Sequence, residues 1–472
     1  MSEAKRLIKN TGIIAIGGMA TKVVQFLLLP LYTTALSPAE YGIVDYLNTI
    51  ALFCVPVVTL LMDEALFRFL IDCQSNEDRA RAITSSSVVL FAGSLVFVLL
   101  IIAGSFLFHI ENAVWICLLV LSGSLLTMVS ALLRGTGDTT GYTIMNFLAS
   151  ASMIAMNVVF IVVFHWGVVG MLAASVISQA VVAFLYCAAK GVWRLFDFTT
   201  VSLGYISSLL RYAIPLIPNK VSWTIMNMFS RLVVMNVLGS ASAGLFAVAY
   251  RFPSAMDTLY GFFYMSWKES SARALNDGGE VDFYNSVYKI LRRMMMSIVL
   301  LMTALMPAVY TVLIDSSYAE GILYVPVLLL AMYFQNISGF YGGIFTAHKD
   351  TNIMGTTTIV SALLCLVLTL SLTPIAGLWG ASLASLAATS FVNEYRRRKV
   401  AQYAKLREDY REAACTLIGI VIVFVTFYVF VWTKSLLALF VGIAAALAYS
   451  IALNYEMLKA STSYIVRVVK RH

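Results

Sequence analysis

The sequence predicts an all-α, polytopic membrane protein with about fourteen transmembrane helices. Of its 472 residues, 60% are hydrophobic and only 12% are charged, whereas a soluble domain carries about 25% charged residues. The apolar residues are grouped in stretches of about 20, the length at which a helix crosses a bilayer. Basic residues lie almost entirely in every second connection between these stretches. Repeated motifs further divide the helices into two six-helix bundles in a pseudo-two-fold arrangement, followed by two C-terminal helices.

The predicted spans follow one another with short connections. They cover residues 11–36, 43–69, 85–108, 113–133, 142–164, 168–189, 207–237, 243–267, 287–313, 321–346, 353–374, 378–394, 413–433 and 435–456. The first is longer than the apolar core of a signal peptide, about 7–15 residues, so we expect it to remain as a helix. No connection has room for a soluble catalytic domain, since the longest has about 20 residues. We therefore expect a function carried out between the helices, no catalytic residue, and no enzyme.

The distribution of Lys and Arg predicts the orientation of the chain. The connections on the side of the N-terminus contain 26 of the 32 basic residues, five lie within spans, and only Lys434 lies on the opposite side. Under the positive-inside rule both termini are cytoplasmic, which requires an even number of spans. The net charge of +8 mostly reflects this topology. The run RRRK at 396–399 is therefore interpreted as a cytoplasmic segment near anionic lipid, and not as a nucleic-acid site.

Two pairs of motifs indicate an internal duplication. GVVGMLAASV, which begins at Gly167, recurs 210 residues later as GLWGASLASL, and LSPAEYG at 36–42 recurs 202 residues later as LGSASAG. Glycine and small residues permit close helix packing, so one match alone is weak evidence. Both pairs occupy equivalent outer turns, however, and predict two six-span repeats inserted in the same sense, as in transporters. The expected parts are an N-terminal lobe at 1–200, a second lobe at 201–395, and a basic linker with two further spans and a cytoplasmic tail at 396–472.

Five basic residues lie within the spans: Lys22, Arg68, Lys220, Arg231 and Arg251. A charge at the bilayer centre costs roughly 2.5–3.5 kcal/mol on insertion scales, so such residues usually face a wet cavity or a partner. At a rise of about 1.5 Å per residue, Lys22 and Lys220 lie on the order of 16 Å from the cytoplasmic edge, at equivalent positions of the two repeats. Their own spans contain no acid. We predict that both face a cavity for an anionic ligand.

The other charges within the spans leave two interpretations open. Arg231 lies close to the outer end of its span and Arg68 close to the inner end, where each either lines the cavity or reaches the interface as an anchor. Arg251 lies about eight residues below the outer edge of its span, and Asp257 lies six residues deeper. Asp257 pairs either with Arg251 or with a cation across the cavity.

Prolines interrupt the two spans that carry the matched lysines. Pro30 lies in the first span, and Pro215 and Pro218 precede Asn219 in span 207–237. Prolines inside membrane helices produce kinks. These are either static kinks or hinges for a switch between inward-open and outward-open states.

Two groups of motifs open the two halves of the chain. The first consists of Asn10, Gly17, Lys22, Pro30 and LSPAEYGIVDY at 36–46; the second consists of LLRYAIPLIPNKVSW at 209–223, SRLVV at 230–234 and GLFAVAYRF at 244–252. Taken in this order, and with the glycine-containing outer turns, they resemble the Wzx-type polysaccharide flippases of the MOP superfamily. The resemblance covers nearly the whole chain. It implies transport of an undecaprenyl-pyrophosphate-linked oligosaccharide from the inner to the outer leaflet of the cytoplasmic membrane, by alternating access, for surface polysaccharide biosynthesis.

The resemblance also implies how the substrate is held. Lys22, Lys220, Arg231 and Arg251 would bind the head group, because basic side chains form strong hydrogen bonds to phosphate oxygens. The lipid tail would stay in the bilayer. Membrane lipids and other polysaccharide assembly proteins are the further candidate partners.

Further residues are expected around these cations. Tyr250 and Asn219 are candidate contacts to sugar or phosphate, and Asp257 and Arg68 are candidate auxiliary residues. Some relatives bind sodium through acids of the second lobe, but here spans 207–237, 353–374 and 378–394 contain no acid except Glu394. The coupling ion is therefore left open.

Other functions fit the sequence less well. Lipid II flippases and multidrug exporters of the same superfamily are the nearest alternatives, although an exporter of cations would carry acids within its lobes. A membrane polymerase or ligase would need acid, Arg or His residues on large outer loops, and these loops are very short. Six scattered cysteines and four histidines far apart in sequence predict neither a disulfide framework nor a metal site, and no cofactor is expected.

Overall fold

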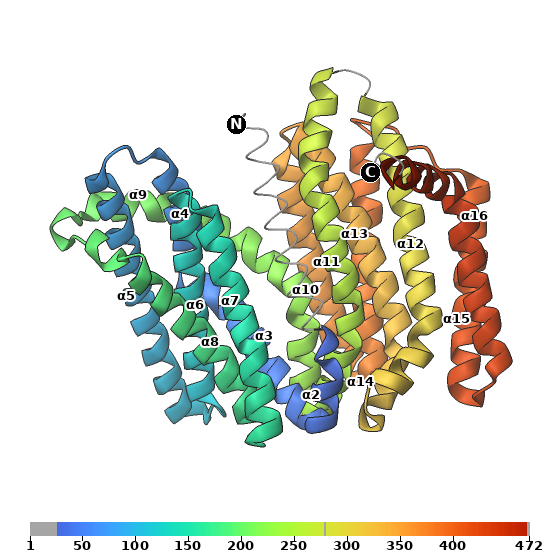
Figure 1. Ribbon diagram of the computed structural model, residues 1–472, viewed down its shortest axis with the longest axis horizontal. Helices are drawn as coiled ribbons and strands as arrows, with labels where there is room; N and C mark the ends of the chain where they lie inside the picture. Colours follow the sequence, from blue (N-terminus) through green and yellow to red (C-terminus); the bar gives the residue numbers. More distant parts are fainter. Residues whose placement is uncertain (1–25, 278–279, 470–472) are drawn as a thin grey trace. The chain divides into compact units, whose positions relative to one another are not determined.

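The computed structural model describes residues 26–277 and 280–469 (Figure 1). All regular elements in these two ranges are helices, which confirms the predicted all-α class. The chain forms two compact units, Met1–Gly244 and Leu245–His472, which meet within one helix. The unit boundary differs from the lobe boundary at 200/201 that the repeat predicts. The two lobes are inferred from the sequence repeat and remain a prediction, whereas the two units are defined by contacts within the structure.

Unit 1 is a helical bundle with several breaks. Its elements are α2 (Leu29–Ala35), α3 (Pro38–Val58), α4 (Met62–Asp72), α5 (Asn76–Phe108), α6 (Ala113–Gly135), α7 (Thr139–Val158) with a π-helical extension η1 (Val159–Val163), α8 (Gly167–Ala189), η2 (Val192–Leu195), η3 (Phe198–Thr200), α9 (Leu203–Ala213), η4 (Ile214–Leu216) and α10 (Ile217–Leu238). Helix α6 lies at the centre and packs against α3, α4 and α8. Helix α10 packs against α3, so the start of the predicted second lobe lies within this unit.

Polar side chains fix the helix ends of unit 1. Ser37 and Glu40 form a capping box at the start of α3, in which the Ser37 amide donates to Glu40 Oε2 at 2.9 Å. Asp138 caps α7 by accepting from the Gly141 amide at 2.8 Å, and its other oxygen binds Lys190 Nζ at 2.8 Å. The Lys190 ammonium and the Gly141 amide hold the pKa of Asp138 below its usual value. These bonds join the ends of α7 and α8 outside the apolar stretches.

Unit 2 consists of long helices. Its elements are α11 (Ser240–Asp277), which begins in unit 1, α12 (Glu280–Leu313), η5 (Ser316–Tyr324), α13 (Val325–Ala347), α14 (Thr351–Val400), α15 (Tyr410–Thr433) and α16 (Leu436–Val469). Helix α14 is broken at Ala376 and at Gly377, where φ is +57°. The break separates the predicted spans 353–374 and 378–394. Helix α13 packs on α14, and α12 packs on both α15 and α16.

Most of the predicted spans coincide with helices, but several of them are divided. In the described residues ten helices are long and apolar enough to cross a membrane, or eleven if the bent pair Val192–Thr200 and Leu203–Ser222 counts as one span. Predicted span 43–69 is two helices, because Leu60 and Leu61 adopt positive φ values of 50° and 52° between α3 and α4. Span 207–237 is divided into α9, η4 and α10, and α7 ends in a π-helical turn. The first span lies mostly outside the described residues.

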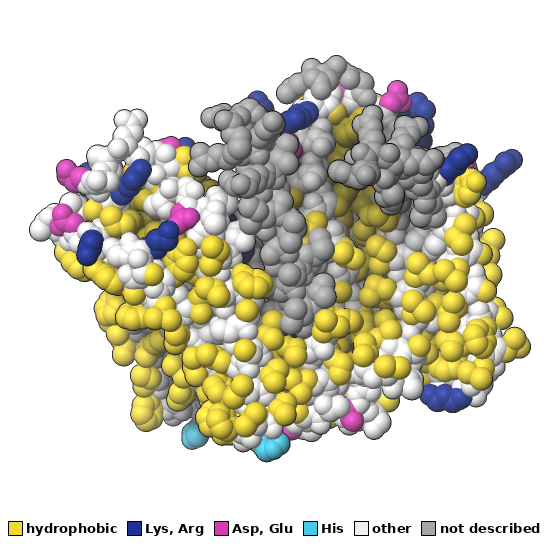
Figure 2. Space-filling model, viewed as in Figure 1, with side chains coloured by type: hydrophobic (Ala, Val, Ile, Leu, Met, Phe, Trp, Pro, Cys, Tyr) yellow, Lys and Arg dark blue, Asp and Glu magenta, His cyan; other side chains and the backbone are white. Residues whose placement is uncertain are grey.

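The side chains are distributed as a membrane protein requires. In each unit, hydrophobic side chains cover the middle of the helices on the face shown in Figure 2, and Lys, Arg, Asp and Glu gather towards the helix ends. Helix α5 illustrates this, since only 6% of its most apolar window is buried inside the structure. Such a helix is stable in lipid and would be unstable in water.

Within unit 1, the two motifs of the shorter repeat contact each other directly. A Cβ atom on Gly42 would overlap the Ser240 carbonyl oxygen, and one on Gly244 would overlap the Pro38 carbonyl oxygen. Gly42 and Gly244 are equivalent positions of the repeat, as are Pro38 and Ser240. Reciprocal contacts between equivalent residues are the mark of a two-fold axis. The duplication seen in the sequence is therefore accompanied by a local two-fold contact of backbone on backbone.

Gly42→Ala and Gly244→Ala should each destabilise the protein by about 1–3 kcal/mol, the usual cost of overpacking a close contact. Thermal unfolding in detergent measures the effect. Gly204→Ala is the control, because a Cβ atom there meets nothing within 4 Å. Equal melting temperatures for all three variants would contradict the close contact.

Candidate functional site

A largely buried ion pair between α10 and α3 joins the two predicted repeats. Arg231 Nη1 lies 3.1 Å from Asp45 Oδ1 of α3, and the two side chains are only 17% and 11% exposed. Asp45 follows Gly42 by three residues, so the pair lies about one turn along α3 from the glycine contact. From the sequence, Arg231 is expected either to line the cavity or to reach the interface as an anchor, and Asp45 is not expected to be its partner. The signal was present, because Asp45 is the only acid in the apolar stretch that follows Glu40 up to Asp63.

Lys220 lies near the other end of α10 and is exposed. Asp63, in the first turn of α4, is buried and interacts electrostatically with Lys220. Helix α10 contains two basic residues and no acid. The helix itself therefore carries an excess of positive charge among otherwise uncharged residues.

The three predicted hinge prolines lie at helix breaks and not in helix interiors. Pro30 is in the first turn of α2, directly after a helical break at Leu28. Pro215 lies in the 3₁₀ turn η4, and Pro218 lies in the first turn of α10. Proline is tolerated in a first turn because its missing N–H has no partner there. That these prolines act as hinges remains a prediction.

In unit 2 the predicted residues lie along α11. Arg251, Tyr250 and Asp257 are all partly exposed, and the Tyr250 ring lies 6.1 Å from that of Phe246. The Ser254 hydroxyl donates to the Arg251 carbonyl at 2.8 Å, a bond typical of serine within a helix. Because Arg251 and Lys220 belong to different units, their joint contribution to one cavity remains a prediction.

Three further residues complete the predicted set. Arg68 forms a helical i,i+4 pair with Asp72 at 2.7 Å, in which the two side chains are 47% and 65% exposed. Both interpretations of Arg68, cavity or anchor, are compatible with this pair and remain predictions. Lys22 and the side chain of Asn219 lie outside the described residues.

Arg396 is a buried cation that the sequence analysis counted as part of a cytoplasmic connection. It lies in the last turns of α14 and is only 8% exposed. Its guanidinium donates to Thr357 Oγ1 at 2.8 Å, Thr358 Oγ1 at 3.0 Å and the Ser338 carbonyl at 3.2 Å. All these acceptors are neutral, and no ion pair of Arg396 occurs among the described residues. The charge is stabilised by hydrogen bonds alone, which join α13 to both halves of α14.

A second charged cluster in unit 2 connects α12 and α15. Glu412 is 6% exposed and accepts from Arg293 Nη2 at 2.8 Å, with Arg292 Nη2 at 3.8 Å. Arg293 also donates to the Leu453 carbonyl of α16 at 2.9 Å. From the sequence, Arg292 and Arg293 are expected only to mark the side of the membrane on which the N-terminus lies. A buried acid between two arginines has a structural role as well.

The comparisons with known proteins agree with this architecture. A family model described as polysaccharide biosynthesis protein matches residues 7–267. No curated protein matches the sequence.

Several solved structures have the same fold. The structure of "Lipid II flippase MurJ, inward closed conformation" matches with a TM-score of 0.68 and 15% identity, over 94% of this chain and 99% of that chain. An inward-facing multidrug resistance MATE family transporter of the MOP superfamily matches with a TM-score of 0.64 and 17% identity, over 81% and 95% of the two chains. A MOP superfamily transporter from Pyrococcus furiosus, described as having a binding pocket of reverse polarity, gives a TM-score of 0.55 and 17% identity over 83% of this chain and 96% of that chain. At these identities the similarity establishes the fold alone.

Removing one partner of the Arg231–Asp45 pair should be strongly destabilising. Asp45→Asn leaves a buried arginine charge without compensation, which costs about 3–5 kcal/mol. The exchange of both charges, Asp45→Arg with Arg231→Asp, should recover part of this loss. Thermal unfolding of the single and exchanged variants measures both effects. Asp72→Asn is the control, because that pair is exposed and worth about 0–1 kcal/mol.

Glu412→Gln should lower stability and leave transport per folded molecule unchanged. The variant leaves Arg292 and Arg293 close together without their shared carboxylate, a loss of about 3–5 kcal/mol. Glu269→Gln is the matched control, because its pair with Arg273 is exposed. A normal melting temperature for Glu412→Gln would contradict the structural role.

Proposed function

Because the chain belongs to the family of polysaccharide biosynthesis proteins, we propose that it is a flippase for a lipid-linked oligosaccharide. The substrate would be an undecaprenyl-pyrophosphate-linked glycan, which the protein moves from the inner to the outer leaflet of the cytoplasmic membrane. The transporter fold of its structural relatives supports movement by alternating access. Both termini would be cytoplasmic, as the distribution of basic residues favours.

The observation that carries the proposal is the excess of positive charge on α10. This helix contains Lys220 and Arg231 and no acid, and its other residues are uncharged. A cation within a span is costly unless a ligand or partner compensates it; Asp45 of α3 is the partner of Arg231, and an anionic head group would add further compensation for the two cations. A pyrophosphate carries the opposite charge and accepts several charge-assisted hydrogen bonds. Bases without acids on α10 disfavour a cationic drug as the substrate.

The proposed head-group site consists of the cations predicted from the sequence. Lys22, Lys220, Arg231 and Arg251 would hold the pyrophosphate. In the structure Arg231 is paired with Asp45, so a phosphate oxygen would have to compete with this carboxylate. Such competition offers a simple way to couple substrate binding to the contact between α3 and α10.

The remaining residues have subsidiary roles in the proposal. Asn219 and Tyr250 would contact sugar or phosphate, and Asp257 would pair with a neighbouring cation. Pro30, Pro215 and Pro218 would act as hinges, since each lies at a helix break.

Lipid II flippase activity is the second candidate, and one observation favours it. The structural match to the lipid II flippase MurJ extends over 94% of this chain, further than the matches to the transporters above. Complementation separates the two functions. Rescue of a strain lacking its glycan flippase supports our proposal, and rescue only of a strain lacking its lipid II flippase supports the alternative.

Lys220→Ala should reduce surface polysaccharide at least tenfold. The loss of a hydrogen bond to a charged group is worth about 1.5–3 kcal/mol, and about 1.4 kcal/mol corresponds to a factor of ten. The measurement is surface glycan in a strain that depends on this protein, at equal protein levels in the membrane. Lys22→Ala should behave in the same way.

Lys289→Ala provides the control for loss of a lysine as such. Lys289 is exposed near the start of α12, in the part of the helix that precedes the apolar stretch. Unchanged glycan in both Lys22→Ala and Lys220→Ala would exclude the cationic-cavity mechanism.

A further inference from the structure

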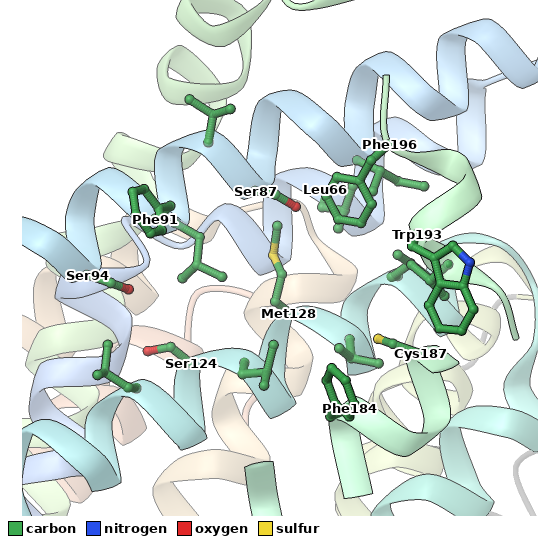
Figure 3. A pocket seen from close by; sticks show the side chains of 18 of the residues that line it. Leu66, Ser87, Phe91, Ser94, Ser124, Met128, Phe184, Cys187, Trp193 and Phe196 are labelled. Carbon is green, nitrogen blue, oxygen red and sulfur yellow. The ribbon is translucent and has the colours of Figure 1, made fainter. Parts of the chain in front are cut away.

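Unit 1 contains an apolar groove that the proposed function does not use. Its volume is about 920 Å³, and its walls come from α4, α5, α6, α8 and the connection that follows α8 (Figure 3). Phe91 and Ser94 of α5 face Ser124 and Met128 of α6 across it, as Figure 3 shows. The size falls within the range of about 300–1,000 Å³ that is typical of sites for small molecules. The groove is therefore large enough for a specific ligand.

The lining of the groove is suited to a hydrocarbon. It contains no charged residue, and its polar side-chain groups are three serine hydroxyls, the Cys187 thiol and the indole N–H of Trp193. The Ser124 side chain is fully buried, and its hydroxyl has no hydrogen-bond partner among the residues that the structure describes. A polar ligand would find almost nothing to bind here, whereas an apolar chain would cover this surface.

The groove lies at the surface of the helix bundle, where its lining residues Phe91 and Phe184 are 72% and 68% exposed, and not at the α3–α10 contact. Helix α5, which forms one wall, is the candidate span with the smallest buried share, 6%. The opposite face of α6 packs against α3, where a Cβ atom on Gly123 would lie 3.3 Å from Val55 Cγ2. Helix α6 thus separates the groove from the pair of Arg231 and Asp45. A lipid of the surrounding bilayer has direct access, and a head group held on α10 does not lie beside the groove.

One end of the groove has the composition of a membrane interface. Trp193 and Phe196, from the connection between α8 and α9, form this end in Figure 3. Aromatic side chains are enriched at the level of lipid head groups. The neighbouring Arg194 is exposed, and among the described residues it forms no ion pair. Basic residues beside a span attract anionic lipids.

We propose that this groove binds one acyl chain of an anionic phospholipid of the bilayer, with the lipid phosphate at Arg194. The occupant is a resident lipid, distinct from the transported substrate. The bound chain fills the space between α5 and α6, which pack less closely than α6 does with α4 or α8. The proposal goes beyond the proposed function and does not depend on it.

A phosphatidylglycerol with a diazirine in its acyl chain tests the site in reconstituted vesicles. After illumination, mass spectrometry of peptides should locate adducts on the lining segments of α5, α6 and α8. Val98→Trp, which fills the groove, should reduce this labelling at least fivefold. Leu99→Trp is the matched control, since Leu99 is the next residue of α5, is 55% exposed, and does not line the groove.

The head-group contact has its own measurement. In competition between phosphatidylglycerol and phosphatidylcholine probes, Arg194→Gln should lower the preference for the anionic lipid about fivefold, equivalent to about 1 kcal/mol for one basic residue. Labelling by the acyl chain should persist in this variant.

Two results would overturn the proposal. Equal labelling of Val98→Trp and Leu99→Trp would mean that α5 contacts only bulk lipid. Displacement of the probe by an undecaprenyl phosphate, but not by unlabelled phosphatidylglycerol, would assign the groove to the substrate chain. Ser94→Trp fills the same space from another position and replaces Val98→Trp if that variant does not fold. Glycan transport is measured in parallel, so that failure of the lipid site and failure of the flippase function are seen separately.

Discussion

A charge inside an apolar layer must be compensated, and the pair of Arg231 and Asp45 is the clearest case in unit 1. The two residues lie 3.1 Å apart on α10 and α3, helices that the sequence repeat assigns to different halves of the chain. Neither charge is stable alone in this environment, because burial of an unpaired ion costs several kcal/mol. The pair therefore fixes how α10, from the predicted second repeat, packs against α3, from the predicted first repeat.

The glycine contact supports the same junction by a different mechanism. Gly42 and Gly244 allow the backbones around Pro38 and Ser240 to touch, and any side chain at either position would prevent this. Close backbone approach at small residues is the main source of helix association in membranes, where hydrophobic burial offers little. An ion pair and a glycine crossing about one turn apart give a junction that is both specific and compact. A phosphate competing for Arg231 would weaken the ion pair and leave the contact at Gly42 and Gly244 in place. The helices could then change their angle about this glycine contact.

The basic residues of unit 2 show that one residue type satisfies two requirements. Arg293 and Arg396 lie in the polar stretches that the positive-inside rule assigns to the side of the N-terminus. At the same time Arg396 joins α13 to α14, and Arg293 joins α12 to α15 and α16. Arg396 is held by neutral oxygens alone, a geometry for which the five donors of a guanidinium are well suited and a lysine would not be. Charge counting along the sequence cannot distinguish these buried arginines from exposed ones such as Arg398, because both lie in the same polar run.

The sequence by itself determined the helical class, the membrane environment and the position of almost every apolar helix, because each depends on composition and on runs of about 20 residues. It also contains the two pairs of similar outer turns from which the repeat is predicted. Only the tertiary structure decided the partners of the charges. Asp45 and Arg231 are 186 positions apart in the sequence. Arg396 donates hydrogen bonds to Thr357, in the first half of α14, and to Ser338 of α13. The break at Leu60 and Leu61 and the groove beside α5 also required the structure. Local sequence sets where a helix is stable, but which face meets which depends on contacts between distant segments.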